Sequence, residues 1–240
     1  MTSKVLFLYN EHLATEALLG EAFVEQGFDV DTLTVVPAEH RDSPAASQVT
    51  FPDPTDYDVI VPLGATWPVY DEALLAGWVS EEMAMVRKAA EAGVALLGVC
   101  FGGQLLAQTF GGTVGRAPTP EIGWYDLEIS DTGLIPEGPW FQWHYDRWTL
   151  PPGAVEVART ANASQAFVLG RALALQFHPE VDRALLEAWL PTAGPDEPAN
   201  VGLTVDELRL QTDKFADPER VNRLVRNFID RIVRQPSPSS

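Results

Sequence analysis

Short apolar runs alternate with segments of helical periodicity through the first half of the chain. This alternation is typical of a parallel sheet whose strands are joined by crossover helices. The apolar runs predict buried strands at Lys4–Tyr9, Val30–Val36, Asp58–Leu63 and Val94–Val99. The helix-compatible stretches between them each end at a glycine, which readily terminates a helix: they are Glu16–Gln26, Glu72–Ala92 and Gln104–Phe110.

The pattern changes after Thr113, where glycines and prolines divide the chain into shorter segments. These segments predict additional, partly antiparallel strands at Trp124–Ile129, Phe141–Tyr145, Val155–Ala161, Ala166–Leu169 and Ala172–Phe177. Helices are expected at Arg183–Leu190, Val205–Phe215 and Pro218–Val233. Asp217 is suited to cap the last helix, whose arginines, Arg220 among them, predict a solvated basic face over an apolar stripe.

These elements predict an α/β fold: a three-layer, open, mostly parallel sheet with helices on both faces and additional antiparallel strands. The chain shows no internal repeat and no compositional linker. We therefore expect one domain over residues 1–234, followed by a flexible tail at residues 235–240.

Composition and charge narrow the range of partners. Of the 240 residues, 46% are hydrophobic and 21% charged, which is ordinary for a globular protein and excludes a disordered one. The formal charge of −18 repels phosphate backbones and anionic lipids, so neither nucleic acid nor a membrane surface is an expected partner. The longest apolar stretch, Val94–Phe101, is far shorter than the roughly 18 to 20 residues of a spanning helix. Because the N-terminal apolar run is also too short for a signal peptide, we expect a cytoplasmic protein.

Cys100 is the chain's single cysteine, so an intrachain disulfide and a multi-thiolate zinc site are excluded. It lies where a predicted strand meets a predicted helix, with Gly98 and Gly102 two residues to either side. That layout is typical of a nucleophile elbow, in which a sharp turn presents the side chain at the start of the next helix. The helix dipole there favours a thiolate, and the amide of Phe101 is placed to stabilise an oxyanion. The alternative is a buried cysteine that only fills the core.

His178 and Glu180 follow the last predicted strand and supply a candidate base. Residues i and i+2 of an extended chain lie on the same side, and Pro179 stiffens the segment. Glu180 can therefore orient the His178 imidazole, as in a nucleophile–base–orienter triad. The alternative is that His178 only ends a strand and that Glu180 is a solvated loop acid.

The segments GVCFGGQ and QFHPE, whose Cys100 and His178 are 78 residues apart, together resemble the class I (triad-type) glutamine amidotransferases. Within that family, the chain is similar to stand-alone homologues of the GMP synthase amidotransferase domain. The resemblance extends from about Val5 to Pro191 and implies that Cys100 attacks the carboxamide of glutamine while His178 transfers the proton and Glu180 orients it. It further implies an oxyanion hole formed by Gly64, Ala65 and Phe101. Four residues would bind substrate by the same matching: Gln104, Trp143, His144 and Tyr145.

Three positions depart from the family pattern. Ala65 replaces the second of two adjacent glycines in the oxyanion loop and would resist a positive φ. Gly103 stands where histidine is common, and Tyr145 replaces a glycine that lies against the amino-acid end of glutamine. These changes bear on the substrate more than on the thiol chemistry.

The sequence therefore leaves three candidate functions beside a redox-sensing thiol, which would share the Cys100 turn but would not need the QFHPE segment. The first is glutamine hydrolysis through a Cys100 thioester, with ammonia passed to a separate synthetase subunit. The second is hydrolysis of a γ-glutamyl peptide or amine, and the third is a catalytically silent homologue that binds a metabolite or a partner. No metal-ligand spacing and no nucleotide-binding motif appears in the sequence, so neither a metal nor a cofactor is expected.

Overall fold

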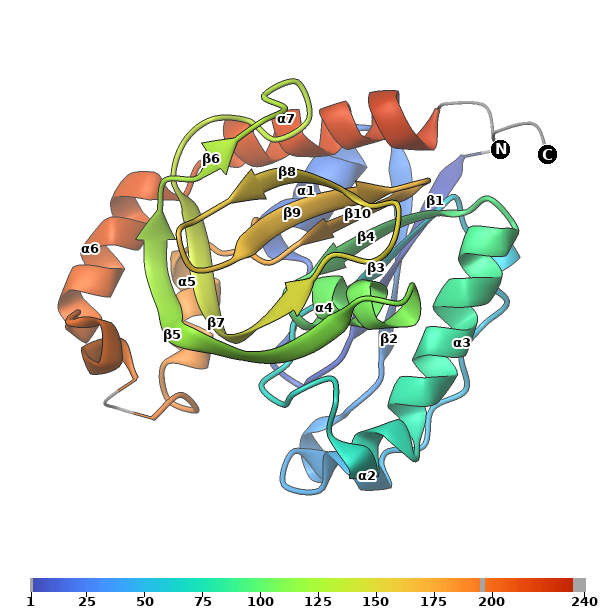
Figure 1. Cartoon of the computed structure of the whole chain (residues 1–240), viewed down its shortest axis with the longest axis horizontal. Helices are drawn as coiled ribbons and strands as arrows, with labels where there is room; N and C mark the ends of the chain where they lie inside the picture. Colours follow the sequence, from blue (N-terminus) through green and yellow to red (C-terminus); the bar gives the residue numbers. More distant parts are fainter. Residues whose placement is uncertain (1, 195–196, 235–240) are drawn as a thin grey trace.

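The computed structural model describes residues 2–194 and 197–234, and its central feature is an eight-stranded sheet (Figure 1). In their order across the sheet, the strands are β2 (Phe28–Thr34), β1 (Ser3–Tyr9), β3 (Val59–Pro62), β4 (Ala95–Val99), β10 (Ala172–Leu175), β9 (Ser164–Leu169), β8 (Val155–Arg159) and β6 (Glu128–Ile129). The first five are mutually parallel, and β9, β8 and β6 extend the sheet with antiparallel pairings.

The sheet separates two hydrophobic cores. Alternate residues of β1 point to opposite faces, so Val5 and Phe7 join one core while Leu6 and Leu8 join the other. Every residue of β3, β4 and β10 is buried, which explains their continuous apolar sequences.

Helices cover both faces of the sheet. The first core is closed by α1 (Ala17–Glu25), α7 (Pro218–Phe228) and a π-helical turn, Ile229–Val233. The second is closed by α3 (Trp78–Glu91), which follows the short α2 (Glu72–Leu75), and by α4 (Phe101–Thr109). Figure 1 shows α7 and α3 on opposite sides of the sheet. The predicted three-layer α/β class is confirmed.

A separate antiparallel ribbon of β5 (Thr113–Tyr125) and β7 (Trp140–Thr149) curves past the sheet. Its β7 packs against α5 (Arg183–Trp189) and α6 (Val205–Phe215) around a third cluster that contains Phe141 and Leu208. A backbone bridge between Phe141 and His178 joins this ribbon to the segment after β10.

Two predicted elements need correction. The strand expected at Trp124–Ile129 is two elements: Trp124 and Tyr125 end β5, which begins at Thr113, whereas Glu128–Ile129 form β6 and pair with β8 in the main sheet. The first half of β5 was not predicted because Pro118 and Pro120 lie in its irregular part. The helix expected at Glu72–Ala92 is divided at Gly77, whose backbone angles, φ −130° and ψ −131°, are not helical.

The predicted basic face of the last helix is also wrong at one position. Arg220 is 7% exposed, and its guanidinium lies 5.1 Å from the ring centroid of Trp140. Asp217 caps this helix as expected, by accepting a hydrogen bond from the Arg220 amide.

A single domain over residues 1–234 stays a prediction, and the expected tail at 235–240 lies outside the described residues. None of the helices in the described part of the chain is long and apolar enough to cross a membrane.

Candidate active site

Cys100 occupies a strained turn between β4 and α4. Its φ of 51° and ψ of −107° lie in a region that non-glycine residues rarely adopt. The flanking glycines are required because a side-chain carbon at Gly98 would lie 2.5 Å from the Gly102 carbonyl oxygen, and one at Gly102 would overlap the Pro62 carbonyl. Such strain persists only where the surrounding structure enforces it, and it is common at functional sites.

Gly103 is small for a reason that the sequence does not reveal. A side-chain carbon there would lie 2.6 Å from the Leu175 carbonyl oxygen and 3.1 Å from the ring of Trp148. The space beside the turn is thus filled by neighbouring elements, and a larger residue at this position would displace β10 or β7.

His178 and Glu180 are buried together, at 4% and 2% exposure, with His178 Nδ1 2.7 Å from Glu180 Oε1. The alternative interpretation of Glu180 as a solvated loop acid is therefore wrong. Because a carboxylate only accepts hydrogen bonds, Nδ1 carries the proton in this contact and Nε2 is the ring nitrogen left for Cys100.

Opposing effects act on the His178 imidazole. Burial lowers its pKa, but the charges of Glu180 and Cys100 and hydrogen bonds to both raise it, and the net result is a pKa well above the ordinary value. Trp189 packs edge-on against the ring at 5.1 Å, and Phe141 contacts it at 6.3 Å. The imidazole is thus held in one orientation by a carboxylate and two aromatic rings.

Gln176 is a residue of this site that sequence reasoning missed. Its side chain is fully buried, and Nε2 lies 3.7 Å from Cys100 Sγ, within donor distance of the sulfur. The Gln104 amide donates to Gln176 Oε1 at 3.3 Å, which orients Nε2 toward the sulfur. The available signal was position, since Gln176 lies two residues before His178 in an extended segment.

The segment after β3 lies against the thiol and the imidazole. A side-chain carbon at Gly64 would lie 3.0 Å from His178 Cε1 and 3.6 Å from Cys100 Cβ. Among the described residues, Ala17 and Cys100 alone combine a side chain with positive φ, so Ala65 does not carry the expected backbone strain. On the other side of Cys100, α4 begins at Phe101, whose amide belongs to the first helical turn and has no intrahelical acceptor.

The other predicted substrate contacts lie on β7. Trp143 places its carbonyl oxygen 4.0 Å from Cys100 Sγ and donates its indole N–H to Glu197 at 2.7 Å. His144 points into a buried contact, with Nε2 3.0 Å from Glu121 Oε2 and Nδ1 2.9 Å from the Asp146 carbonyl. The Tyr145 ring stacks under the guanidinium of Arg116 at 4.5 Å.

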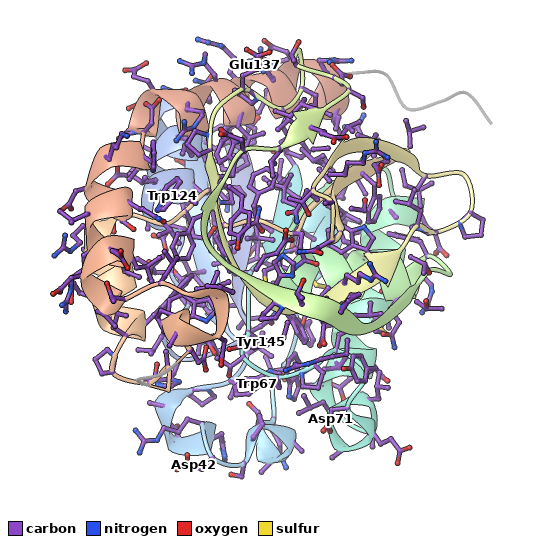
Figure 2. The ribbon with its side chains drawn as sticks, turned by 60° about the vertical axis from the view of Figure 1, so that its left-hand side comes forward. Asp42, Trp67, Asp71, Trp124, Glu137 and Tyr145 are labelled. Atoms are coloured by element: carbon purple, nitrogen blue, oxygen red, sulfur yellow. The ribbon has the colours of Figure 1, made fainter. Side chains whose placement is uncertain are left out.

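A cavity of about 600 Å³ brings these groups together. Cys100, His178 and Glu180 line it together with Gly64, Ala65 and Gln104, and the β7 residues Trp143, His144 and Tyr145 line it as well. Figure 2 shows Tyr145 near Trp67, another lining residue, with Asp42 on the loop below them. The volume is typical of small-molecule sites. Within the described ranges, no group of three metal-ligating side chains is assembled.

Comparison with known proteins places this site in a family. The family model for glutamine amidotransferase class I matches residues 18–187. A GMP synthase (glutamine-hydrolysing) of Aeropyrum pernix is 34% identical over 177 residues, which cover 63% of this chain and 34% of that protein. The enzyme of the same name from Thermus thermophilus is 36% identical over 151 residues, 58% of this chain and 30% of the relative. The chain thus matches about a third of the length of these relatives.

Two solved structures superimpose on this chain over nearly its full length. A glutamine amidotransferase from Thermotoga maritima superimposes with a TM-score of 0.81 at 26% identity, over 98% of this chain and 100% of the other. A glutamine amidotransferase from Methylobacillus flagellatus, at 21% identity, has the same fold with a TM-score of 0.81, over 100% of this chain and 99% of the other. With its elbow cysteine beside a buried histidine–glutamate pair, the chain belongs to the class I glutamine amidotransferase family.

Proposed function

We propose that this protein hydrolyses the side-chain amide of glutamine through a thioester on Cys100. The observation that carries the proposal is the buried His178–Glu180 contact of 2.7 Å beside the strained Cys100 turn. A thiolate paired with an imidazolium is the reactive form of such a cysteine, and the raised pKa of His178 keeps the imidazole protonated.

The steps follow from these positions. Cys100 Sγ attacks the amide carbon, and the carbonyl oxygen becomes an oxyanion that accepts hydrogen bonds from the Phe101 amide and the Gly64–Ala65 backbone. His178 then gives its Nε2 proton to the departing nitrogen, so that ammonia leaves and the γ-glutamyl thioester forms. Water, deprotonated by His178, attacks the thioester, releases glutamate and restores the thiol.

The ammonia is proposed to pass to a separate synthetase subunit. This chain matches about a third of the length of two relatives that are named glutamine-hydrolysing GMP synthases. A synthetase partner would capture ammonia before it diffuses away. The chemistry needs a reduced Cys100, which fits a reducing compartment such as the cytoplasm.

A glutamine-mimicking diazoketone tests the proposal directly. The reagent should add once to the protein, as measured by intact mass, and the adduct should be absent in Cys100→Ser. Ammonia release from glutamine should disappear in the same variant. If Cys100→Ser retains ammonia release, the assignment of the nucleophile is wrong.

A second candidate, hydrolysis of γ-glutamyl peptides or amines, is favoured by the size of the cavity and by its charged and aromatic lining. Arg116, Tyr145 and Glu197 line the cavity that holds Cys100, and Tyr145 stands where the resemblance places a glycine against the amino-acid end of glutamine. A changed amino-acid pocket favours a substrate other than free glutamine. A panel of γ-glutamyl amines assayed beside glutamine separates the two: faster turnover of a conjugate supports this second function. A protein that turns over no member of the panel and forms no adduct is the silent binder.

A further inference from the structure

A carboxyl group is buried beneath the proposed oxyanion loop, and the mechanism above does not use it. Glu82 lies on the inner face of α3 with its side chain fully buried among Trp78, Val79 and Val86. Burying an ionised carboxylate without a partner cation is costly, so such a group is either paired or neutral. No cation acts on Glu82 within the described part of the chain.

The partner of Glu82 is Asn10, which follows β1 and is also fully buried. Asn10 Nδ2 lies 3.2 Å from Glu82 Oε1 and 3.2 Å from the carbonyl oxygen of Leu63. A backbone carbonyl only accepts hydrogen bonds, which fixes the orientation of the Asn10 amide. Its two N–H groups thus join α3 to the residue that directly precedes Gly64.

The same two side chains each retain a buried polar atom without a hydrogen-bond partner: Asn10 Oδ1 and Glu82 Oε2. A proton on Glu82 Oε2 would give both atoms a partner, because an acid O–H donates to an amide oxygen while the amide N–H donates to Oε1. We propose that Glu82, as a carboxylic acid paired with Asn10, is a positioning residue that holds the Gly64–Ala65 backbone in place for the reaction.

A second contact anchors the other side of the same dipeptide. The Thr66 amide donates to Glu11 Oε2 at 3.1 Å. Neighbouring residues after β1, Asn10 and Glu11, therefore fix Leu63 and Thr66, one on either side of Gly64–Ala65. Hydrogen bonds thus hold the chain on both sides of the Gly64–Ala65 dipeptide. Its geometry depends on whether Asn10 keeps its hydrogen bond to the Leu63 carbonyl.

The pair is sensitive to alkaline pH. Burial raises the pKa of Glu82 to about 8, and the Asn10 hydrogen bond lowers it only in part. Within the described part of the chain, neither Glu81, which is exposed on α3, nor Glu11, which follows Asn10 and accepts the Thr66 amide, shifts the pKa of Glu82. Loss of the proton places a carboxylate oxygen against Asn10 Oδ1, so the pair separates and Leu63 is released.

Glu82→Gln tests this inference because glutamine keeps both hydrogen bonds of the acid and cannot ionise. Glu81→Gln, an exposed neighbour on the same helix, is the matched control. In the first readout, kcat for glutamine is measured from pH 6.5 to 9.5. The parent protein and Glu81→Gln should lose activity by about tenfold per pH unit above the Glu82 pKa, whereas Glu82→Gln should keep only the loss that follows from deprotonation of His178. The same alkaline loss in Glu82→Gln would overturn the inference.

This first readout rests on the proposed function, so a second readout does not use turnover. Amide hydrogen exchange of the peptide containing residues 64–66 is compared at pH 7 and pH 9, relative to the same unfolded peptide. Extra exchange at pH 9 should occur in the parent protein and Glu81→Gln but not in Glu82→Gln. If the exchange differs as expected but the protein does not hydrolyse glutamine, only the proposed function is refuted. If exchange is equal in all three proteins, only the positioning role of Glu82 is refuted.

A carboxyl NMR titration of the unmodified protein covers the case in which Glu82→Gln does not fold. The Glu82 carbon should show the acid form at pH 6 and should titrate on the alkaline side of neutrality. A carboxylate signal at pH 6 would overturn the inference without any variant.

Discussion

His178 Nδ1 lies 2.7 Å from Glu180 Oε1 in a contact that is almost completely buried. A buried contact of this kind does more than hold the ring, because the carboxylate charge also stabilises the imidazolium. The charge and the orientation supplied by Glu180 can be separated experimentally.

Glu180→Gln keeps a hydrogen-bond acceptor near Nδ1 and removes the charge. The pKa of His178 should fall, since the Glu180 charge is the largest effect that raises it. We expect kcat to fall by about 10² to 10⁴-fold, as expected for a base deprived of its carboxylate. The alkylation rate of Cys100 near neutral pH should fall as well. Glu21→Gln, an exposed position on α1, is the control and should change neither quantity.

Gln176→Met removes the N–H that faces Cys100 Sγ while keeping the approximate volume of the side chain. Hydrogen bonds to charged groups contribute about 1.5 to 3 kcal/mol, so kcat should fall by about tenfold to a hundredfold. Alkylation of Cys100 should slow in parallel. Unchanged alkylation and turnover would show that the 3.7 Å contact does not stabilise the thiolate.

Gly102→Ala should destabilise the protein by about 2 kcal/mol or more, because the added methyl overlaps the Pro62 carbonyl. Gly115→Ala is the matched control: nothing lies within 4 Å of its added carbon, and its φ is not positive. We expect urea unfolding of Gly115→Ala to stay within about 0.5 kcal/mol of the parent protein. A similar loss in both variants would contradict a steric requirement at the turn.

Stability should depend on pH through Glu82. Its pKa is 4.5 in the reference state and about 8 in the folded protein, so the folded state binds the proton more tightly. The stabilisation is complete below pH 4.5 and is lost as the pH rises toward 8, at up to about 1.4 kcal/mol per pH unit. Urea unfolding from pH 4 to 8.5 should therefore show a decline that is absent in Glu82→Gln. A decline of equal slope in both proteins would assign it to other groups.

Much of the fold was predictable because its signals are local. The buried strands β3, β4 and β10 are continuous apolar runs, and the Cys100 turn is marked by glycines within two residues of it. The first half of β5 was not predicted, because it contains two prolines. The division of the predicted helix at Gly77 was not predicted either, because the residues on both sides have helical composition. Arg220 appeared to belong to a solvated face, and only the packing of α7 reveals that it lies over Trp140.

The sequence by itself determined the order of the elements, the strained position of Cys100 and the proximity of His178 to Glu180. Each of these depends on residues a few positions apart, where sterics and periodicity act. Only the tertiary structure decided that Asn10 meets Glu82, 72 residues away, and that His144 turns toward Glu121. Those contacts depend on how sheet, ribbon and helices pack, because a buried polar group takes its partner from whichever element is placed against it.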